Sequence, residues 1–317
     1  ADTGVDLVEL REPVRDEHGV DVEATLAALR AQVMGLTPAQ LSQARQSIER
    51  VMLEFTLAYM ETAICMDTAG IRESQVRELT NGDYGKIDLM WLDLCEISET
   101  YEIHFPWGRI AAAAREGQPG MITVARGTHS AYENYLTSEL KIPTEVWNCP
   151  WEACMPMTQS WSYNRQPKYK STQTLLNMLV QVVSRGGNFL LNVGPDPLGI
   201  LDDEVYARLR GIGDWMKVNS EGIYGTKPVA PHHVGNVYFT AKDEYVYAFY
   251  AADDGDNNIP DKIFIGDVVP QGSYVTMLGS NVRLKWKKGS DGVYVNIPES
   301  LRKIAPCDYV FCLKIKV

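Results

Sequence analysis

Three charged residues follow short apolar segments of the sequence, and their types could together carry out acid–base chemistry. Asp93 lies two residues after Trp91, Arg126 follows a short apolar segment, and Glu152 follows a second tryptophan. Two carboxyl groups can serve as nucleophile and general acid/base, a fixed guanidinium can hold hydroxyl groups, and tryptophan faces suit the C–H surface of a sugar. For one isolated Asp at such a place, a helix cap or a turn is the commoner explanation. The combination predicts hydrolysis of a glycosidic bond.

These residues need a scaffold that brings the ends of several strands together, and the sequence from about residue 84 to 225 predicts one. Apolar segments of strand length alternate there with helical segments. Strands are expected at 87–92, 121–124, 146–151 and 188–193, and helices at 171–184 and 202–218. This alternation predicts a parallel α/β architecture. In a parallel α/β barrel the reactive groups collect at the carboxyl ends of the strands.

The flanking regions have different patterns. Apolar residues recur at helical spacing over 21–62, which predicts a helical hairpin. After Pro228, short segments of alternating apolar and polar residues are typical of an antiparallel β-sandwich. We therefore expect three parts: a helical region 1–80 that could complete the barrel, a (β/α)-barrel portion 81–227, and a β-sandwich domain 228–317.

The composition argues against two classes of partner. Thirty basic residues stand against 41 acidic ones, which gives a net charge of −11. Nucleic acids and anionic membrane surfaces bind clustered Lys and Arg, so neither partner is expected. The sequence has no apolar run of about 18 residues and its start shows no basic segment before an apolar stretch. Neither a transmembrane helix nor a signal peptide is therefore expected.

The six cysteines are spread along the chain. The pairs Cys149/Cys154 and Cys307/Cys312 lack the two-residue spacing of a zinc knuckle, and no histidine lies close to them in sequence. We therefore expect buried free thiols, no bound metal and no cofactor.

Seven segments of the sequence closely resemble glycoside hydrolase family 29, the α-L-fucosidases. They are 84–93, 132–135, 150–155, 161–164, 186–195, 215–219 and 275–279. The resemblance runs from about residue 75 to the end of the chain. It implies a TIM-like (β/α)-barrel, here with an atypical helical amino-terminal half, followed by a β-sandwich. It also implies hydrolysis of terminal α-L-fucosyl residues of oligosaccharides or glycoconjugates, and it favours a secreted or periplasmic location.

The resemblance implies a role for individual residues. Asp93 would be the nucleophile of a retaining double displacement, and Glu152 the general acid/base. Because family members differ in this acid, Glu139 is the alternative. Trp91, Arg126 and Trp161 would contact the substrate, and His129 is the histidine closest to the candidate site. We therefore expect Trp91, Arg126, His129 and Trp161 to contact the substrate.

Two departures from the family pattern motivate a second hypothesis. Leu94 stands where the family usually has a glycine after its nucleophile, and a leucine there could crowd the sugar. The family's His-His-Asp-Gly-Phe type of motif, whose histidines hold fucose hydroxyls, is absent from the sequence. The alternative to an enzyme is therefore a non-catalytic carbohydrate-binding or scaffold protein on a fucosidase-derived fold.

Overall fold

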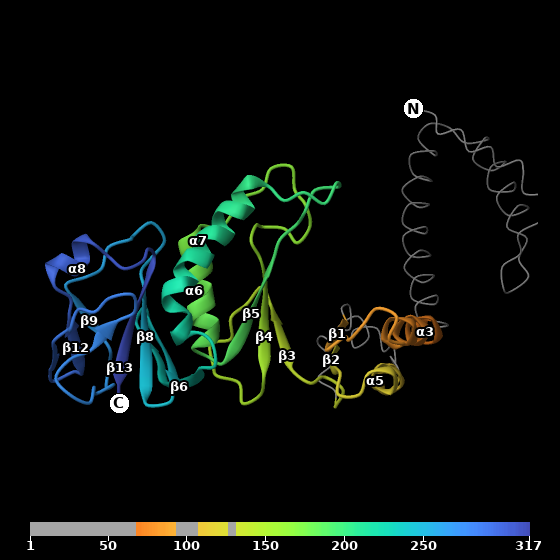
Figure 1. The fold of residues 1–317 in the computed structure, drawn as a ribbon, viewed down its shortest axis with the longest axis horizontal. Coiled ribbons are helices and arrows are strands. Elements are labelled where there is room, and N and C mark those ends of the chain that lie inside the picture. Colours follow the sequence, from red (N-terminus) through yellow and green to blue (C-terminus); the bar gives the residue numbers. More distant parts are fainter. Residues whose placement is uncertain (1–67, 93–106, 126–130) are drawn as a thin grey trace, which may run out of the picture. The chain divides into compact units, whose positions relative to one another are not determined.

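The computed structural model describes residues 68–92, 107–125 and 131–317 (Figure 1). The chain divides into two compact units, Ala1–Glu78 and Leu79–Val317. Of the first unit, the structure describes only residues 68–78, which belong to helix α3 (Thr68–Thr80). The helical hairpin expected over 21–62 lies outside the described residues.

Within the described residues, the α/β part of the second unit has five parallel strands in two sheets. Strand β1 pairs with β2, while β3, β4 and β5 pair in that order. The strands are β1 (Leu89–Leu92), β2 (Ile122–Ala125), β3 (Leu136–Glu139), β4 (Trp151–Pro156) and β5 (Gly187–Asn192). The helices are α5 (Trp107–Gly117), α6 (Thr172–Val183) and α7 (Asp203–Asn219), with the short 3-10 helix η2 (Ser220–Gly222). The parallel pairing agrees with the α/β prediction for these residues.

Helix α6 covers one face of the β3–β4–β5 sheet. Ser171 caps the helix, because its side chain accepts a hydrogen bond from the backbone N–H of Thr174. Val182 near the end of the helix packs against the odd-numbered residues of β4, which are Trp151, Ala153 and Met155. Because side chains alternate along a strand, the even-numbered residues of β4 lie on the opposite face.

This opposite face carries the polar side chains of the sheet, and we call it the inner face. Thr137 of β3, Glu152 of β4 and Asn188 of β5 occupy one level of the register on it. Glu139 and Cys154 occupy the next level toward the carboxyl ends of their strands. The inner face thus presents two glutamates from neighbouring strands.

One expected strand is displaced. We expected a strand over 146–151, but β4 begins at Trp151 and ends at Pro156. Pro150 provides the physical reason, since proline has no N–H for the hydrogen bonds of a central strand. The strand starts after the proline. Glu152 therefore lies near the beginning of a strand, and its expected place after a strand end was wrong.

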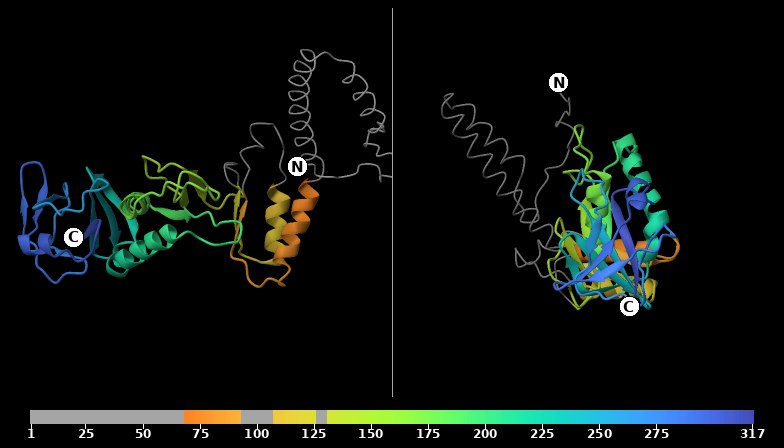
Figure 2. Two further views of the ribbon diagram at one scale, coloured as in Figure 1. Left: turned by 90° about the horizontal axis from the view of Figure 1, so that it is seen from above. Right: turned by 90° about the vertical axis from the view of Figure 1, so that its left-hand side faces the viewer.

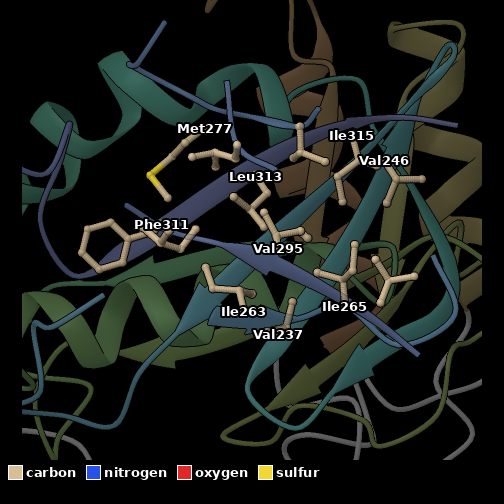
Figure 3. Packing of buried hydrophobic residues seen from close by; sticks show 14 of the residues in the cluster. Val237, Val246, Ile263, Ile265, Met277, Val295, Phe311, Leu313 and Ile315 are labelled. Atoms are coloured by element: carbon tan, nitrogen blue, oxygen red, sulfur yellow. The ribbon is translucent and has the colours of Figure 1, made fainter. Parts of the chain in front are cut away.

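Two antiparallel sheets form the region from Lys227 onward. Their strand orders are β10-β13-β8-β7-β6 and β11-β12-β9. The strands are β6 (Lys227–Val234), β7 (Val237–Lys242), β8 (Tyr245–Ala251), β9 (Lys262–Phe264), β10 (Thr276–Met277), β11 (Trp286–Lys288), β12 (Val293–Asn296) and β13 (Val310–Lys316), with helix α8 (Glu299–Lys303). Apolar side chains from both sheets meet in one core, among them Val246, Leu313 and Val295 (Figure 3). The antiparallel β architecture predicted after Pro228 is confirmed.

Helices α6 and α7 lie side by side and pack on the antiparallel sheet that contains β8 (Figures 1 and 2). Trp215 of α7 is 2% exposed, and its ring lies 6.2 Å from that of Phe249 on β8. The Trp215 indole N–H donates a hydrogen bond of 2.7 Å to the carbonyl oxygen of Val310 at the start of β13. The Asn177 side-chain amide of α6 also donates to the Ala252 carbonyl, at 2.7 Å. Apolar contact and satisfied backbone groups together fix the α/β part on the β-sandwich.

We expect Trp215→Ala to lower the free energy of unfolding by about 3–5 kcal/mol, because it removes a large buried side chain and leaves a cavity. Trp215→Phe keeps most of the packing but leaves the Val310 carbonyl without its donor, at an expected cost of about 1–3 kcal/mol. Urea denaturation followed by circular dichroism measures both. The control is Tyr206→Ala on the same helix, where the side chain is 44% exposed. A Trp215→Ala variant as stable as this control would contradict the proposed anchoring.

Candidate active site

The structure describes four of the seven residues predicted for the site. Asp93, Arg126 and His129 lie outside the described residues. The four that are described are Trp91, Glu139, Glu152 and Trp161. They lie at different positions along the parallel strands. The two glutamates therefore have different surroundings.

Glu152 is held between two side chains on the inner face. The indole N–H of Trp91, on β1, donates to Oε1 of Glu152 at 3.3 Å. Tyr135, just before β3, is a second hydrogen-bonding partner of the Glu152 carboxyl. The contact with Trp91 joins side chains of the two parallel sheets, β1 in one and β4 in the other.

Burial dominates the electrostatics of this cluster. It raises the pKa of Glu152, while the hydrogen bonds from Trp91 and Tyr135 act in the opposite direction because they stabilise the carboxylate. Burial also raises the pKa of Tyr135, with the neighbouring Glu152 adding to the effect, to about 12. The Tyr135 hydroxyl is therefore protonated near neutral pH and can donate a hydrogen bond to the carboxyl group.

Glu139 has a different position, at the carboxyl end of its strand. It is the last residue of β3 and lies in register with Cys154. The next residue, Leu140, has a φ of 56°, a left-handed conformation that is uncommon for leucine. The Leu140 N–H donates to the carbonyl oxygen of Cys154 at 3.1 Å, which fixes this turn against β4. Glu139 thus lies at the carboxyl end of β3, the end at which reactive groups collect in parallel α/β barrels.

Trp161 lies in the loop that follows β4. The loop is tied to the ends of two strands, because the side-chain amide of Asn192 on β5 donates to the Trp161 carbonyl at 2.8 Å. The Lys170 ammonium donates to the carbonyl oxygens of Pro156 and Thr158, at 2.7 and 2.8 Å. Trp161 is half-buried and lies beyond the carboxyl ends of β4 and β5. It is thus at the same end of the parallel strands as Glu139.

Sequence reasoning missed two residues that organise the site. Tyr135 belongs to a motif that carried the family resemblance, but no role followed from the motif alone. Asn192 lies in the segment 186–195, which also carried the resemblance, and its side-chain amide holds the loop that carries Trp161. The sequence shows only the residue types at these two positions. Their hydrogen-bonding partners are distant in sequence and are known only once the strands are placed side by side.

Four of the six cysteines lie among the described residues. Among the described residues, no group of three or more His, Cys, Asp or Glu side chains could hold a metal ion. Cys154 and Cys312 are buried free thiols, as expected, but Cys149 is exposed. Its exposure contradicts the expectation and follows from its place in the loop before β4.

In the described ranges, no helix has the length and apolar character needed to cross a membrane.

Comparison with known proteins gives matches in both parts of the chain. The family model described as Alpha-L-fucosidase matches residues 66–221, and the model described as Alpha-L-fucosidase C-terminal domain matches residues 231–316. An Alpha-L-fucosidase of Branchiostoma floridae is 32% identical over 199 residues, which are 59% of this chain and 42% of that protein. Tissue alpha-L-fucosidase of Homo sapiens is 30% identical over 175 residues, 52% of this chain and 36% of that protein. The chain therefore spans less than half the length of these relatives.

Solved structures give the same fold. Alpha-L-fucosidase isoenzyme 1 from Paenibacillus thiaminolyticus superimposes with a TM-score of 0.64 at 23% identity, over 78% of this chain and 62% of that chain. The Thermotoga maritima alpha-fucosidase superimposes with a TM-score of 0.62 at 23% identity, over 78% of this chain and 57% of that chain.

Proposed function

The chain belongs to the α-L-fucosidase family, glycoside hydrolase family 29, and from this premise we propose that it hydrolyses terminal α-L-fucosyl residues of fucosylated glycans with retention of configuration. The observation that carries the proposal is the hydrogen bond between Trp91 and Glu152. It links a side chain of β1, the strand that precedes Asp93 in the sequence, to a glutamate of β4, which supports a nucleophile and an acid/base from different strands acting on one sugar.

In the proposed reaction, Asp93 attacks the anomeric carbon, and the bond from that carbon to the leaving oxygen breaks. A protonated glutamate donates its proton to the leaving oxygen. The resulting glutamate then takes a proton from water, whose oxygen bonds to the anomeric carbon and releases the Asp93 carboxylate. Arg126, His129 and Trp161 are proposed substrate contacts, with Trp91 beside the sugar.

We assign the acid/base role to Glu139 in preference to Glu152. Asp93 follows Trp91 by two residues, and Glu139 follows Thr137 by two residues. Thr137 is in register with Glu152, the residue that Trp91 contacts. Glu139 is thus one level further toward the carboxyl ends than the Trp91–Glu152 contact, and Asp93 follows the last residue of β1, Leu92, in the sequence. Retaining enzymes hold their two carboxyl groups about 5–5.5 Å apart, and a nucleophile that follows β1 favours an acid/base at the carboxyl end of β3.

The proposal extends to the architecture. We propose that the five parallel strands belong to a (β/α)-barrel whose portion in this chain is 81–227, followed by a β-sandwich domain 228–317. The region 1–80 could complete the barrel.

Hydrolysis of 4-nitrophenyl α-L-fucopyranoside, followed by ¹H NMR, tests the function. We expect release of 4-nitrophenol, with the α-anomer of fucose as the first sugar formed, because two displacements restore the configuration. First formation of the β-anomer would contradict the double displacement. Binding of fucosylated oligosaccharides without hydrolysis of these or of the nitrophenyl substrate would support the non-catalytic alternative.

A further inference from the structure

Glu152 is positioned by the fold for a task other than proton transfer. It is the second residue of β4, near the amino end of the strand. A general acid must reach the leaving oxygen, and in parallel barrels the reacting groups lie at the opposite end of the strands. A half-buried carboxyl group at this level needs another explanation.

The hydrogen bonds of Glu152 provide this explanation. Its Oε1 accepts the N–H of Trp91 at 3.3 Å. An indole nitrogen is a donor only, so a half-buried tryptophan needs an acceptor of this kind to satisfy it. Tyr135 is the second partner, from the segment before β3. The carboxyl group is therefore held from two strands, and it fixes the indole in turn.

The Trp91 ring is the group on which this contact acts. Trp91 is a half-buried residue of β1, and it precedes the proposed nucleophile Asp93 by two residues in the sequence. A ring free to turn about its side-chain torsions would change the wall beside the sugar. A ring whose N–H is held by a carboxyl group has one orientation.

We propose that Glu152 is a positioning residue, which acts through the Trp91 indole to hold that ring flat beside the fucosyl group. The proposal rests on the fucosidase function proposed above. It separates the two glutamates of the inner face: Glu139 exchanges the proton, and Glu152 orients the aromatic wall.

Two replacements of Glu152 distinguish this role from acid/base catalysis. In Glu152→Gln, the amide oxygen can accept the Trp91 N–H while the amide nitrogen donates to the Tyr135 hydroxyl, which can turn to accept. We therefore expect kcat/KM within about 5-fold of the wild type. Glu152→Leu has similar volume but no acceptor, and we expect a KM increase of about 10–100-fold with a smaller change in kcat, the loss associated with an unsatisfied half-buried donor.

The dependence on Trp91 is tested in a Trp91→Phe background, where the donor is absent. There we expect Glu152→Leu to change KM by less than about 3-fold, because the two residues act as a unit. A Glu152→Leu effect that is undiminished in this background would overturn the proposal. A Glu152→Gln loss of about 10²-fold or more in kcat would also overturn it, since that result assigns proton transfer to Glu152.

A spectroscopic measurement tests the contact without turnover. The chain has seven tryptophans, so a ¹H–¹⁵N spectrum resolves a small set of indole signals, of which Trp91→Phe identifies one by its loss. We expect this signal to keep its position in Glu152→Gln and to move upfield in Glu152→Leu. An unmoved signal in Glu152→Leu would overturn the positioning role. A moved signal in a chain without fucosidase activity would support the contact and contradict only the proposed function.

Discussion

Replacing Asp93 by alanine is expected to lower kcat/KM for 4-nitrophenyl α-L-fucopyranoside by about 10⁴-fold or more, because the variant has no oxygen that can form the covalent intermediate. The matched control is Asp88→Ala, five residues earlier, whose carboxylate is 74% exposed and paired with the exposed Lys86. We expect the control to retain activity within about 2-fold, since exposed ion pairs contribute little.

Azide distinguishes a missing nucleophile from a damaged site. In Asp93→Ala a small anion can enter the space of the lost carboxylate, bond to the anomeric carbon and expel 4-nitrophenolate. This single displacement inverts the configuration, so the product is the β-fucosyl azide, identified by ¹H NMR. Equal rates for Asp93→Ala and Asp88→Ala would refute the assignment of the nucleophile.

Much of the fold follows from the periodicity of the sequence. Helix α6 was expected at 171–184 and begins one residue after its Ser171 cap, because cap and apolar spacing both point to the same start. Strand β5 was expected at 188–193 and spans Gly187–Asn192. Its apolar residues form a continuous run, as is typical of a strand in a parallel sheet. Where residue type and period agree, the sequence alone was sufficient.

Strand β3 shows where this reasoning fails. Its residues, Leu136 to Glu139, read Leu-Thr-Ser-Glu and have no apolar run, because three of the four are polar. The segment becomes a strand through its parallel pairing with β4, a long-range contact that periodicity does not reveal. The same gap affected the site, since Glu139 could not be placed at a strand end before this strand was known.

The position of Glu152 depended on a single proline. Apolar residues lie on both sides of Pro150, and the strand was expected over 146–151. The strand lies after it, which moves Glu152 from the carboxyl end of one expected strand to the amino end of the observed one. The preference for Glu152 over Glu139 rested on the family resemblance, and which of the two is the acid stays a prediction.

Replacing Glu139 by glutamine is expected to lower kcat/KM for methyl α-L-fucoside by about 10²–10⁴-fold, because methanol is a poor leaving group and needs a proton as it departs. The effect on formation of the covalent intermediate should be much smaller with a 2,4-dinitrophenyl leaving group, which departs as a stable anion. Pre-steady-state release of 2,4-dinitrophenolate measures formation of the intermediate from the activated substrate, and release of fucose measures turnover of methyl α-L-fucoside. The control is Glu152→Gln, which keeps its hydrogen bonds and should treat both substrates as the wild type does.

The pH dependence of kcat/KM is an independent test of which glutamate is the general acid. A general acid must be protonated in the free enzyme, so kcat/KM of the wild type should fall as the pH rises through the pKa of this acid. Glu139→Gln cannot lose a proton, and its profile should have no such high-pH limb, whereas Glu152→Gln should retain it. If Glu152→Gln loses the high-pH limb and Glu139→Gln keeps it, Glu152 transfers the proton. The reaction then takes place beside the Trp91–Glu152 contact, and Glu139 is not the acid.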